Sequence, residues 1–278
     1  MSMTILTLGH GGGVPVVDPI TKKSPGNTNF AVMFGPLVHE PPFFTDEAMA
    51  GWLQNPYWLV DCGPETVQDL VRWDVIKNLQ GIFITHCHAD HSGGLSSLAW
   101  RCKFIEKIKP RLIVGDEMTL DVIDMQTFEL HWPNWTAYVE SGTWMLDDFF
   151  EVNRCFVSLA ATPSNVDWQF IKADHNIPDE RFPCFSLRLG DGMHKVFFSG
   201  DTAVPSVPPD VDLILHDVQF YADPGDETTV HCPYSKLKAA VPENQRDNVV
   251  MAHTVQAPPT EALEMFRWAC RYSVFHVG

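Results

Sequence analysis

The chain has 278 residues, of which 45% are hydrophobic and 19% are charged. This composition is typical of a globular protein with a sizeable core, and it excludes a disordered chain. Lys and Arg number 19 against 35 Asp and Glu, which gives a net charge of −16. Because proteins bind nucleic acid mainly through Lys and Arg contacts to phosphates, we expect no long nucleic acid among the partners.

Short β-type runs recur along the chain and are interspersed with helical patterns. Strands are predicted at Thr4–Gly9, Asn29–Phe34, Tyr57–Asp61, Gly81–Thr85, Arg111–Val114, Arg154–Ala161, Trp168–Ala173, Cys184–Leu189, Lys195–Ser199, Asp212–Leu215 and Asn248–Ala252. Helices are predicted at Pro64–Val75, Gly93–Cys102, Glu117–Leu130, Pro233–Ala240 and Thr260–Arg271. This order favours two packed sheets flanked by helices. No repeat or linker divides the chain, so we expect a single domain over residues 1–278.

Two segments fit this scheme poorly. His39–Pro56 contains three prolines, and His131–Phe150 contains Trp132, Trp135 and Trp144. One interpretation is that both are edge loops over a satellite core. The alternative is a hydrophobic rim or lid over the functional site, or a contact between two copies of the chain.

Cysteines and terminal residues indicate the compartment. The seven cysteines are scattered without a CxxC pair, which indicates reduced thiols and a cytoplasmic location. Met1–Leu6 lacks the basic region of a signal peptide, and no run approaches the ~20 apolar residues that span a bilayer. The basic run Arg101–Arg111 is interpreted as a solvated helix face, with a local nucleic-acid patch as the alternative.

Four potential metal ligands follow an apolar run within six residues. They are His86, His88, Asp90 and His91, and a pair of glycines comes directly after them. Imidazole and carboxylate groups suit Zn²⁺, and a catalytic zinc site keeps one position open for water. This spacing behind a hydrophobic strand therefore predicts a metal centre.

Four residues cannot saturate two metal ions, so further ligands must come from later loops. Each of three candidates lies just after or beside a β-type run. They are His175, Asp201 and His253. Twelve histidines offer other choices, so these three assignments are weaker than the cluster itself.

The segments His86–His91, Ser199–Thr202 and Met251–Thr254 resemble those of the metallo-β-lactamase superfamily. The resemblance covers nearly the whole chain and implies an α+β fold, the αββα sandwich of two mixed β-sheets flanked by helices. It also implies two Zn²⁺ ions, or Mn²⁺ in their place. By the resemblance, one ion is held by His86, His88 and His175, the other by Asp90, His91 and His253, and Asp201 bridges them. A set of His and Asp alone is similar to the hydrolase branches.

Further segments resemble the tRNase Z-like phosphodiesterases. They are Leu8–Pro15, Asn27–Asn29, Leu59–Gly63 and Leu215–Phe220, with His231 coming 15 residues after His216. In that group a Glu and a His assist departure of the leaving group, which implies these roles for Asp217 and His231. Asp217 is one methylene shorter than Glu, so its reach to His231 is open. The alternative for His231 is a polar residue at a helix start.

The implied chemistry is phosphodiester hydrolysis. Two metal ions ~3.5–4 Å apart lower the pKa of a shared water and stabilise charge on phosphoryl oxygens. Asp90 or Asp201 would orient or deprotonate that water, and His231, held by Asp217, would protonate the leaving alkoxide. The Gly9–Gly13 loop could present backbone N–H groups to a phosphate, but a tight turn accounts for it equally well.

The substrate is predicted to be small. Bacterial tRNase Z carries an RNA-gripping arm between its third His ligand and its bridging Asp. In this chain His175 and Asp201 are only 26 positions apart, so no arm fits. The chain is more similar to armless members, above all the anti-Pycsar enzymes that hydrolyse cyclic mononucleotides. The phosphodiesterase of phosphonate catabolism is another armless member.

We therefore expect a binuclear metal-dependent phosphodiesterase that acts on a small phosphodiester, a cyclic mononucleotide first of all. Resemblance to the tRNase Z-like group also implies a homodimer. One alternative is a tRNA 3′-processing endonuclease. A second is a lactone or thioester hydrolase on the same metal pair, and a third is a metal-containing binding module.

Overall fold

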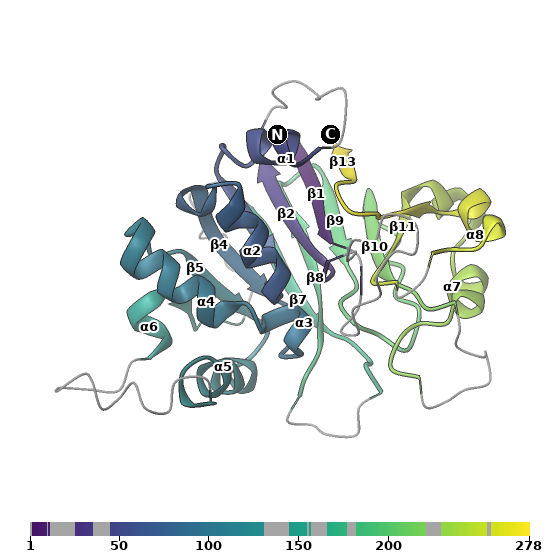
Figure 1. Cartoon of the computed structure of the whole chain (residues 1–278). Coiled ribbons are helices and arrows are strands. Elements are labelled where there is room, and N and C mark those ends of the chain that lie inside the picture. The colour runs from purple at the N-terminus through teal and green to yellow at the C-terminus, as the bar shows by residue number, and fades with distance from the viewer. Residues whose placement is uncertain are drawn as a thin grey trace.

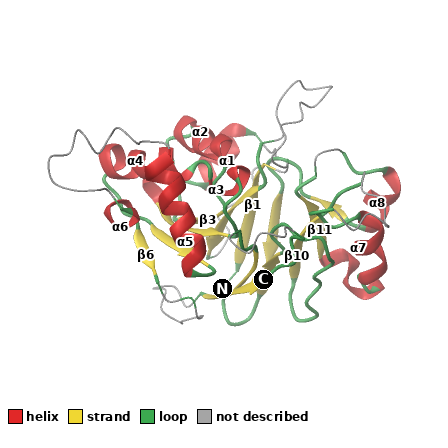
Figure 2. Cartoon of the chain, turned by 90° about the horizontal axis from the view of Figure 1, so that it is seen from below, coloured by secondary structure: helices red, strands yellow, loops and turns green. Residues whose placement is uncertain are grey.

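The computed structural model describes residues 2–9, 11, 26–35, 45–130, 145–154, 156, 166–176, 182–220, 229–254 and 257–278, without the side chains of 128–130. Two β-sheets pack face to face, and helices cover their outer faces (Figure 1). Figure 2 shows the same layers from below, with α7 and α8 on the side opposite to the helices of the first half. The predicted αββα sandwich is confirmed.

The first sheet has seven strands in the order β13-β1-β2-β3-β4-β5-β6. Their bounds are β1 Met3–Gly9, β2 Asn29–Phe34, β3 Tyr57–Val60, β4 Leu79–Ile84, β5 Arg111–Val114, β6 Glu151–Asn153 and β13 Val274–Val277. Strands β3 to β6 are parallel, and the other pairs are antiparallel. The carboxyl ends of β3 and β4 therefore meet at one edge of this sheet.

The second sheet has six strands in the order β12-β11-β10-β9-β8-β7. Their bounds are β7 Asp167–Lys172, β8 Phe185–Gly190, β9 Lys195–Phe198, β10 Leu213–Asp217, β11 Val249–Ala252 and β12 Arg267–Trp268. Strands β9 to β12 are parallel, whereas β8 is antiparallel to both of its neighbours, β7 and β9. The loops after β9, β10 and β11 therefore leave the sheet at the same edge.

Three hydrophobic layers hold the sandwich together. Between the sheets, aromatic rings interlock, with 5.2 Å between the ring centroids of Phe30 and Phe198 and 6.4 Å between those of Phe83 and Trp168. A second layer joins the first sheet to α1, α2, α4 and α5, and a third joins the second sheet to α7 and α8. Each sheet thus buries both faces, as their largely apolar strands predict.

Most predicted helices are present. The α-helices are α1 Asp46–Trp52, α2 Pro64–Arg72, α3 Ala89–Ser92, α4 Leu95–Trp100, α5 Glu117–Asp124, α6 Leu146–Phe149, α7 Tyr234–Ala240 and α8 Thr260–Met265. Helices α4 and α5 continue in π-helical geometry over Arg101–Glu106 and Met125–Leu130, and 3₁₀ turns lie at Ile76–Asn78 and Glu243–Asn248. Proline at the first position of α2 suits a helix start, because a backbone N–H at that position would have no intrahelical acceptor and its absence costs nothing.

Two predicted elements differ from the structure where it is described. The helix expected over Thr260–Arg271 ends at Met265, since Phe266 is extended and Arg267–Trp268 forms β12 beside β11. Long-range pairing overrides the local helical pattern here. The strand expected over Arg154–Ala161 is described only at Arg154 and Phe156, which belong to no strand, and β6 ends just before them at Asn153. Residue 155 and residues 157–161 lie outside the described residues.

The two exceptional segments are described only in part. Their described portions carry α1 and α6, while residues 39–44 and 131–144 lie outside the described residues. The rim, lid and dimer interpretations therefore stay predictions. Within the described ranges, no helix combines the length and the apolar character needed to cross a membrane. The six cysteines that can be described are free, as expected for reduced thiols.

The basic run has local partners. Arg101 Nε lies 2.9 Å from Glu106 Oε1, and Arg111 Nε lies 3.2 Å from Glu151 Oε2. Lys103 Nζ donates to the carbonyl oxygen of Asp148 at 3.0 Å. These contacts support the solvated helix face over a dedicated nucleic-acid patch.

Candidate functional site

The site lies where the carboxyl ends of the parallel strands in the two sheets meet. His86 and His88 follow β4, and α3 carries Asp90 and His91. In the second sheet, loops after β9 and β11 supply Asp201 and His253. Parallel strands bring residues far apart in the chain to one edge, so all seven predicted metal ligands, His175 included, lie in one cluster.

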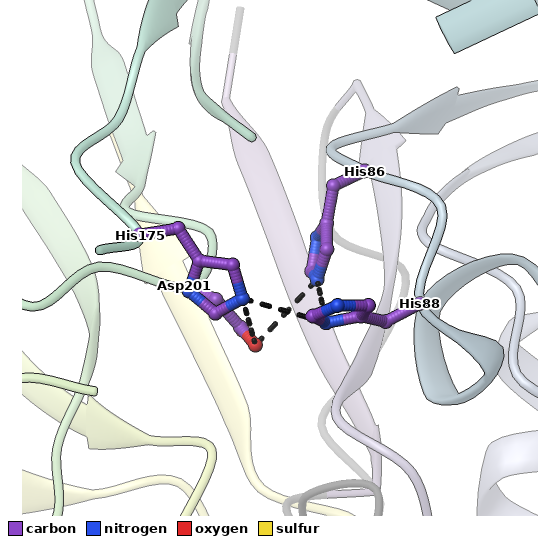
Figure 3. A group of neighbouring side chains, drawn as sticks. All are labelled: His86, His88, His175 and Asp201. Atoms are coloured by element: carbon purple, nitrogen blue, oxygen red, sulfur yellow. Dashed lines mark hydrogen bonds and ion pairs between the residues drawn. The ribbon is translucent and has the colours of Figure 1, made fainter. Parts of the chain in front are cut away.

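A first group of ligand atoms converges from four side chains, His86, His88, His175 and Asp201 (Figure 3). Nδ1 of His88 lies 3.1 Å from Nε2 of His86 and 3.4 Å from Nε2 of His175. Oδ2 of Asp201 lies 3.5 Å from Nε2 of His86. The four ligand atoms all lie within 4.8 Å of one another, a spacing at which one metal ion can be bound.

A second group adjoins the first. Nε2 of His253 lies 3.2 Å from Oδ2 of Asp90 and 3.2 Å from Nε2 of His91. Oδ1 of Asp201 lies 3.3 Å from Nε2 of His91 and 3.5 Å from Nε2 of His253. The two oxygens of Asp201 therefore face different groups, which is the placement that a bridging carboxylate requires.

The donor set fits two divalent metal ions. Asp201 Oδ1 is buried, and no hydrogen bond satisfies it among the described residues. Buried carboxylate oxygens are rarely left in this state without an ion or another partner. Small groups of imidazole nitrogens and carboxylate oxygens are typical of zinc sites.

The pKa shifts differ between the two groups. Burial lowers the pKa of His86 and His88, and it lowers that of His175 to about 4. These imidazoles are therefore neutral near pH 7 and can act as ligands without losing a proton. Burial would raise the pKa of Asp201, but His253, His91 and His86 outweigh it and hold that pKa well below its usual range.

The second group holds protons instead. Burial opposes a charge on His253, but Asp201, Asp217 and Asp90 outweigh it and raise the pKa of His253 to about 10. In the same way, burial is outweighed by Asp201, Asp90 and Asp61 in raising the pKa of His91 well above its usual value. Without metal, both imidazoles are therefore cations near pH 7.

Metal loading of the second group is expected to release about two protons near pH 7.5, because a liganding imidazole must lose its proton. Affinity at this group should then rise with pH up to about pH 10, the pKa of His253, while the first group should show little dependence above pH 7. Titration calorimetry of the metal-free protein in two buffers of different ionisation enthalpy measures the proton count. Two binding events without proton release would contradict these charge states.

Several residues without a predicted role orient the ligands. Oδ2 of Asp61 lies 2.7 Å from Nδ1 of His91, and Asp61 also accepts from the backbone N–H of Thr85 at 2.8 Å. The hydroxyl of Thr85 contacts Asp61 at 2.8 Å and lies 3.1 Å from Nδ1 of His86. These contacts leave Nε2 of both histidines free for a metal ion. Their position in the sequence could have indicated this role, because Asp61 and Thr85 directly follow neighbouring apolar strands.

Unusual backbone conformations also help to orient the candidate metal ligands. Asp61 and His253 adopt left-handed conformations, with φ of 64° and 56°, which are uncommon for residues with a side chain. Gly200 has a φ of 61°, and a Cβ there would lie 2.5 Å from the carbonyl oxygen of Phe185. Glycine is therefore required immediately before Asp201.

The predicted acid–base pair is in contact. Oδ2 of Asp217 lies 2.9 Å from Nδ1 of His231 and accepts from the backbone N–H of Thr202 at 3.1 Å. The shorter Asp therefore does reach His231. Burial lowers the pKa of His231, but Asp217 outweighs it and the pKa is raised. Only 18% of the His231 side chain is exposed.

Asp201, Asp217, His231 and His253 form a further group with ligand atoms within 4.8 Å. Two of these four side chains, Asp217 and His231, already hydrogen-bond each other. Asp217 Oδ1 also lies 3.5 Å from Nδ1 of His253, the nitrogen turned away from the second metal group. Asp217 thus stands between a ligand and His231, a position suited to orienting both.

The glycine loop is described only at Gly9 and Gly11. The N–H of Gly11 donates to the carbonyl oxygen of Gly26 at 2.8 Å, and the carbonyl of Gly11 accepts from Thr28 at 2.9 Å. Gly11 thus uses both of its peptide groups in a bridge to residues 26–28, and the phosphate and tight-turn interpretations of the loop stay predictions. His10, Gly12 and Gly13 lie outside the described residues.

The fold and the paired His/Asp groups define a metallo-β-lactamase-fold protein with a candidate binuclear metal centre. Within that class, a family model described as anti-Pycsar protein Apyc1 matches residues 43–265. The chain belongs to the Apyc1 family.

Individual relatives agree with this placement. The anti-Pycsar protein Apyc1 of Bacillus phage BSP38 is 28% identical over 224 residues, covering 76% of this chain and 82% of the relative. Ribonuclease Z of Crocosphaera subtropica is 42% identical, but only over 59 residues, 21% of this chain and 19% of the relative. The metallo-β-lactamase-fold protein YhfI of Bacillus subtilis aligns with a TM-score of 0.64 at 15% identity, covering 99% of both chains, and bears on the fold alone.

Proposed function

We propose that this protein is a binuclear metal-dependent phosphodiesterase that hydrolyses a small phosphodiester, a cyclic mononucleotide first of all. The observation that carries this proposal is the placement of Asp201 between two ligand groups, with the Asp217–His231 pair beside them. Family membership supports the substrate class. Zinc is the proposed metal because the donors are imidazole and carboxylate groups.

In this proposal His86, His88 and His175 would hold one ion, Asp90, His91 and His253 would hold the other, and Asp201 would contribute one oxygen to each group. When bound, two such ions lower the pKa of a water and neutralise charge on phosphoryl oxygens. Asp90 is buried in the second group beside His253, with 3.2 Å between its Oδ2 and Nε2 of His253, and in this proposal its carboxylate orients the attacking water. His253 and His91 hold the pKa of Asp90 far below its usual range against the opposing effect of burial, so it stays ionised.

His231 is the proposed general acid. Its Nδ1–H is engaged by Asp217, so the proton for transfer is the one on Nε2. Attack by the water-derived hydroxide breaks the P–O bond, and the leaving alkoxide takes this proton to become a hydroxyl group, which stays on the opened product when the substrate is cyclic. His231 is then neutral and still held by Asp217, ready to be protonated again. The raised pKa of His231 keeps the protonated form populated near neutral pH.

The second candidate is a tRNA 3′-processing nuclease, favoured by the local similarity to ribonuclease Z. Two observations favour a small substrate instead. The net charge is −16, and the 26 positions between His175 and Asp201 already contain β8 and β9. Hydrolysis of a lactone or thioester on the same metal pair would not require the Asp217–His231 pair as a general acid.

We expect the protein to hydrolyse a cyclic mononucleotide at a kcat/KM at least about 10²-fold above that for a pre-tRNA at physiological salt, because an acidic chain offers few Lys and Arg contacts to the many phosphates of a long RNA. Rates on both substrates, measured with Zn²⁺ and with Mn²⁺, provide the test, and a lactone serves as the negative control. Faster processing of pre-tRNA would overturn the small-substrate proposal. Light scattering on the same sample tests the proposed homodimer separately.

A further inference from the structure

The backbone around His231 is fixed by a residue that the proposed reaction does not use. The hydroxyl of Thr229 donates to the carbonyl oxygen of His231 at 2.8 Å, and it lies 3.3 Å from the backbone N–H of His231 as acceptor. These contacts hold both peptide groups of His231 to one side chain. Short Thr-to-backbone loops of this kind impose a local conformation on the chain.

The loop that carries the candidate metal ligand His175 also contacts the backbone just before His231. Nδ1 of His175 contacts the carbonyl oxygen of Val230 at 2.9 Å, and Nδ2 of Asn176 donates to the carbonyl oxygen of Thr229 at 3.1 Å. Nε2 of His175 faces the first metal group (Figure 3). Asn176 has a φ of 51°, a left-handed conformation that Asn adopts more readily than most residues. The loop that supplies a metal ligand is thus tied to the two residues before His231.

This arrangement matters because a general acid must lie within hydrogen-bond reach of the leaving oxygen. Asp217 fixes one end of the His231 ring, and Gln219 N–H holds the backbone after His231 through the carbonyl oxygen of Cys232 at 2.8 Å, but neither contact reaches the backbone before His231. A displacement of ~1 Å at a reacting group can cost ~10²-fold in rate. The contacts at Thr229 and Val230 fix that part of the backbone.

We infer that Thr229 is a positioning residue for His231, and that it works together with Asn176 of the His175 loop. The inference rests on the proposed function, in which His231 protonates the leaving group. Thr229 acts through His231, so its loss should weaken proton transfer selectively. Steps that depend on the metal ligands alone should change little.

The test is a series of aryl phosphodiesters that share one alkyl group and differ in the pKa of the leaving phenol. The slope of log kcat/KM against that pKa reports how much the leaving group relies on a proton. We expect Thr229→Val to steepen the slope toward that of His231→Ala. Two hydrogen bonds of ordinary strength predict a loss of about 10-fold for the poorest leaving group and under about 3-fold for p-nitrophenolate.

Matched variants separate positioning from general damage. Thr229→Ser keeps the hydroxyl and should restore the wild-type slope, and Thr260→Val makes the same substitution at the exposed start of α8. Asn176→Gly tolerates the left-handed backbone and should steepen the slope more weakly. All variants should bind the wild-type amount of zinc, measured by atomic emission. If Thr229→Val folds poorly, Asn176→Gly decides the question.

The possible failures are distinguishable. A wild-type slope for Thr229→Val beside a steep slope for His231→Ala would overturn this inference and leave the proposed function standing. A wild-type slope for His231→Ala would remove the general acid, and the inference with it. An equal loss on every leaving group, accompanied by lost zinc, would show that Thr229 has a purely structural role.

Discussion

Asp201→Ala is expected to abolish hydrolysis and to lower the metal content from about two ions per chain to one or none. Asp201 is the only described carboxylate whose two oxygens face both ligand groups, so its removal weakens both. Loss of residues that merely orient ligands typically costs 10–100-fold, so loss of this ligand should cost more than about 10³-fold. Atomic emission and initial rates on one preparation provide the measurement.

Asp210→Ala is a matched control for that experiment. Asp210 is exposed and pairs with Lys195, with 3.0 Å between its Oδ2 and Nζ of Lys195. Exposed ion pairs contribute little to stability, so this variant should keep both metal ions and the wild-type rate. An Asp201→Ala protein with two bound ions and full activity would rule out the bridged binuclear centre. His86→Ala should behave as Asp201→Ala does, since it removes a ligand of the first group.

His231→Ala is expected to slow hydrolysis of a substrate with an alkoxide leaving group by roughly 10²–10⁴-fold, the usual contribution of a general acid. A substrate that releases p-nitrophenolate should suffer much less, because that anion departs without a proton. The metal content should stay at two ions, since His231 lies outside the two proposed ligand sets. Rates on both substrates with parallel metal analysis measure this selectivity.

His194→Ala provides the comparison for His231→Ala. His194 lies in the turn between β8 and β9, at the end of β9 away from Asp201, and its Nδ1 is 3.6 Å from Oδ2 of Asp191. Removal of its imidazole should leave both rates close to wild type. Equal losses on the alkoxide and p-nitrophenolate substrates for His231→Ala would show that His231 is not the acid.

The sequence by itself was sufficient to bring the first four candidate metal ligands together. These four lie within six consecutive residues after an apolar strand, namely His86, His88, Asp90 and His91. Their proximity therefore follows from the short length of chain and needs no tertiary information. Asp201 and His253 could be predicted because each follows a β-type run, and parallel strands carry such residues to a common edge. The αββα fold followed from the same alternation of strands and helices, together with the family resemblance.

Only the tertiary structure decided the finer arrangement. The contact of Asp217 with His231 depends on the path of the chain over 14 residues, and side-chain length alone left it open. The role of Asp61 depends on its contact with His91, 30 positions later. Strand β13 pairs Val277 with Met3 across almost the whole chain, and β12 replaces a predicted helix. In each case a contact between distant segments outweighed local preference, because burial and hydrogen bonding are settled only when those segments pack together.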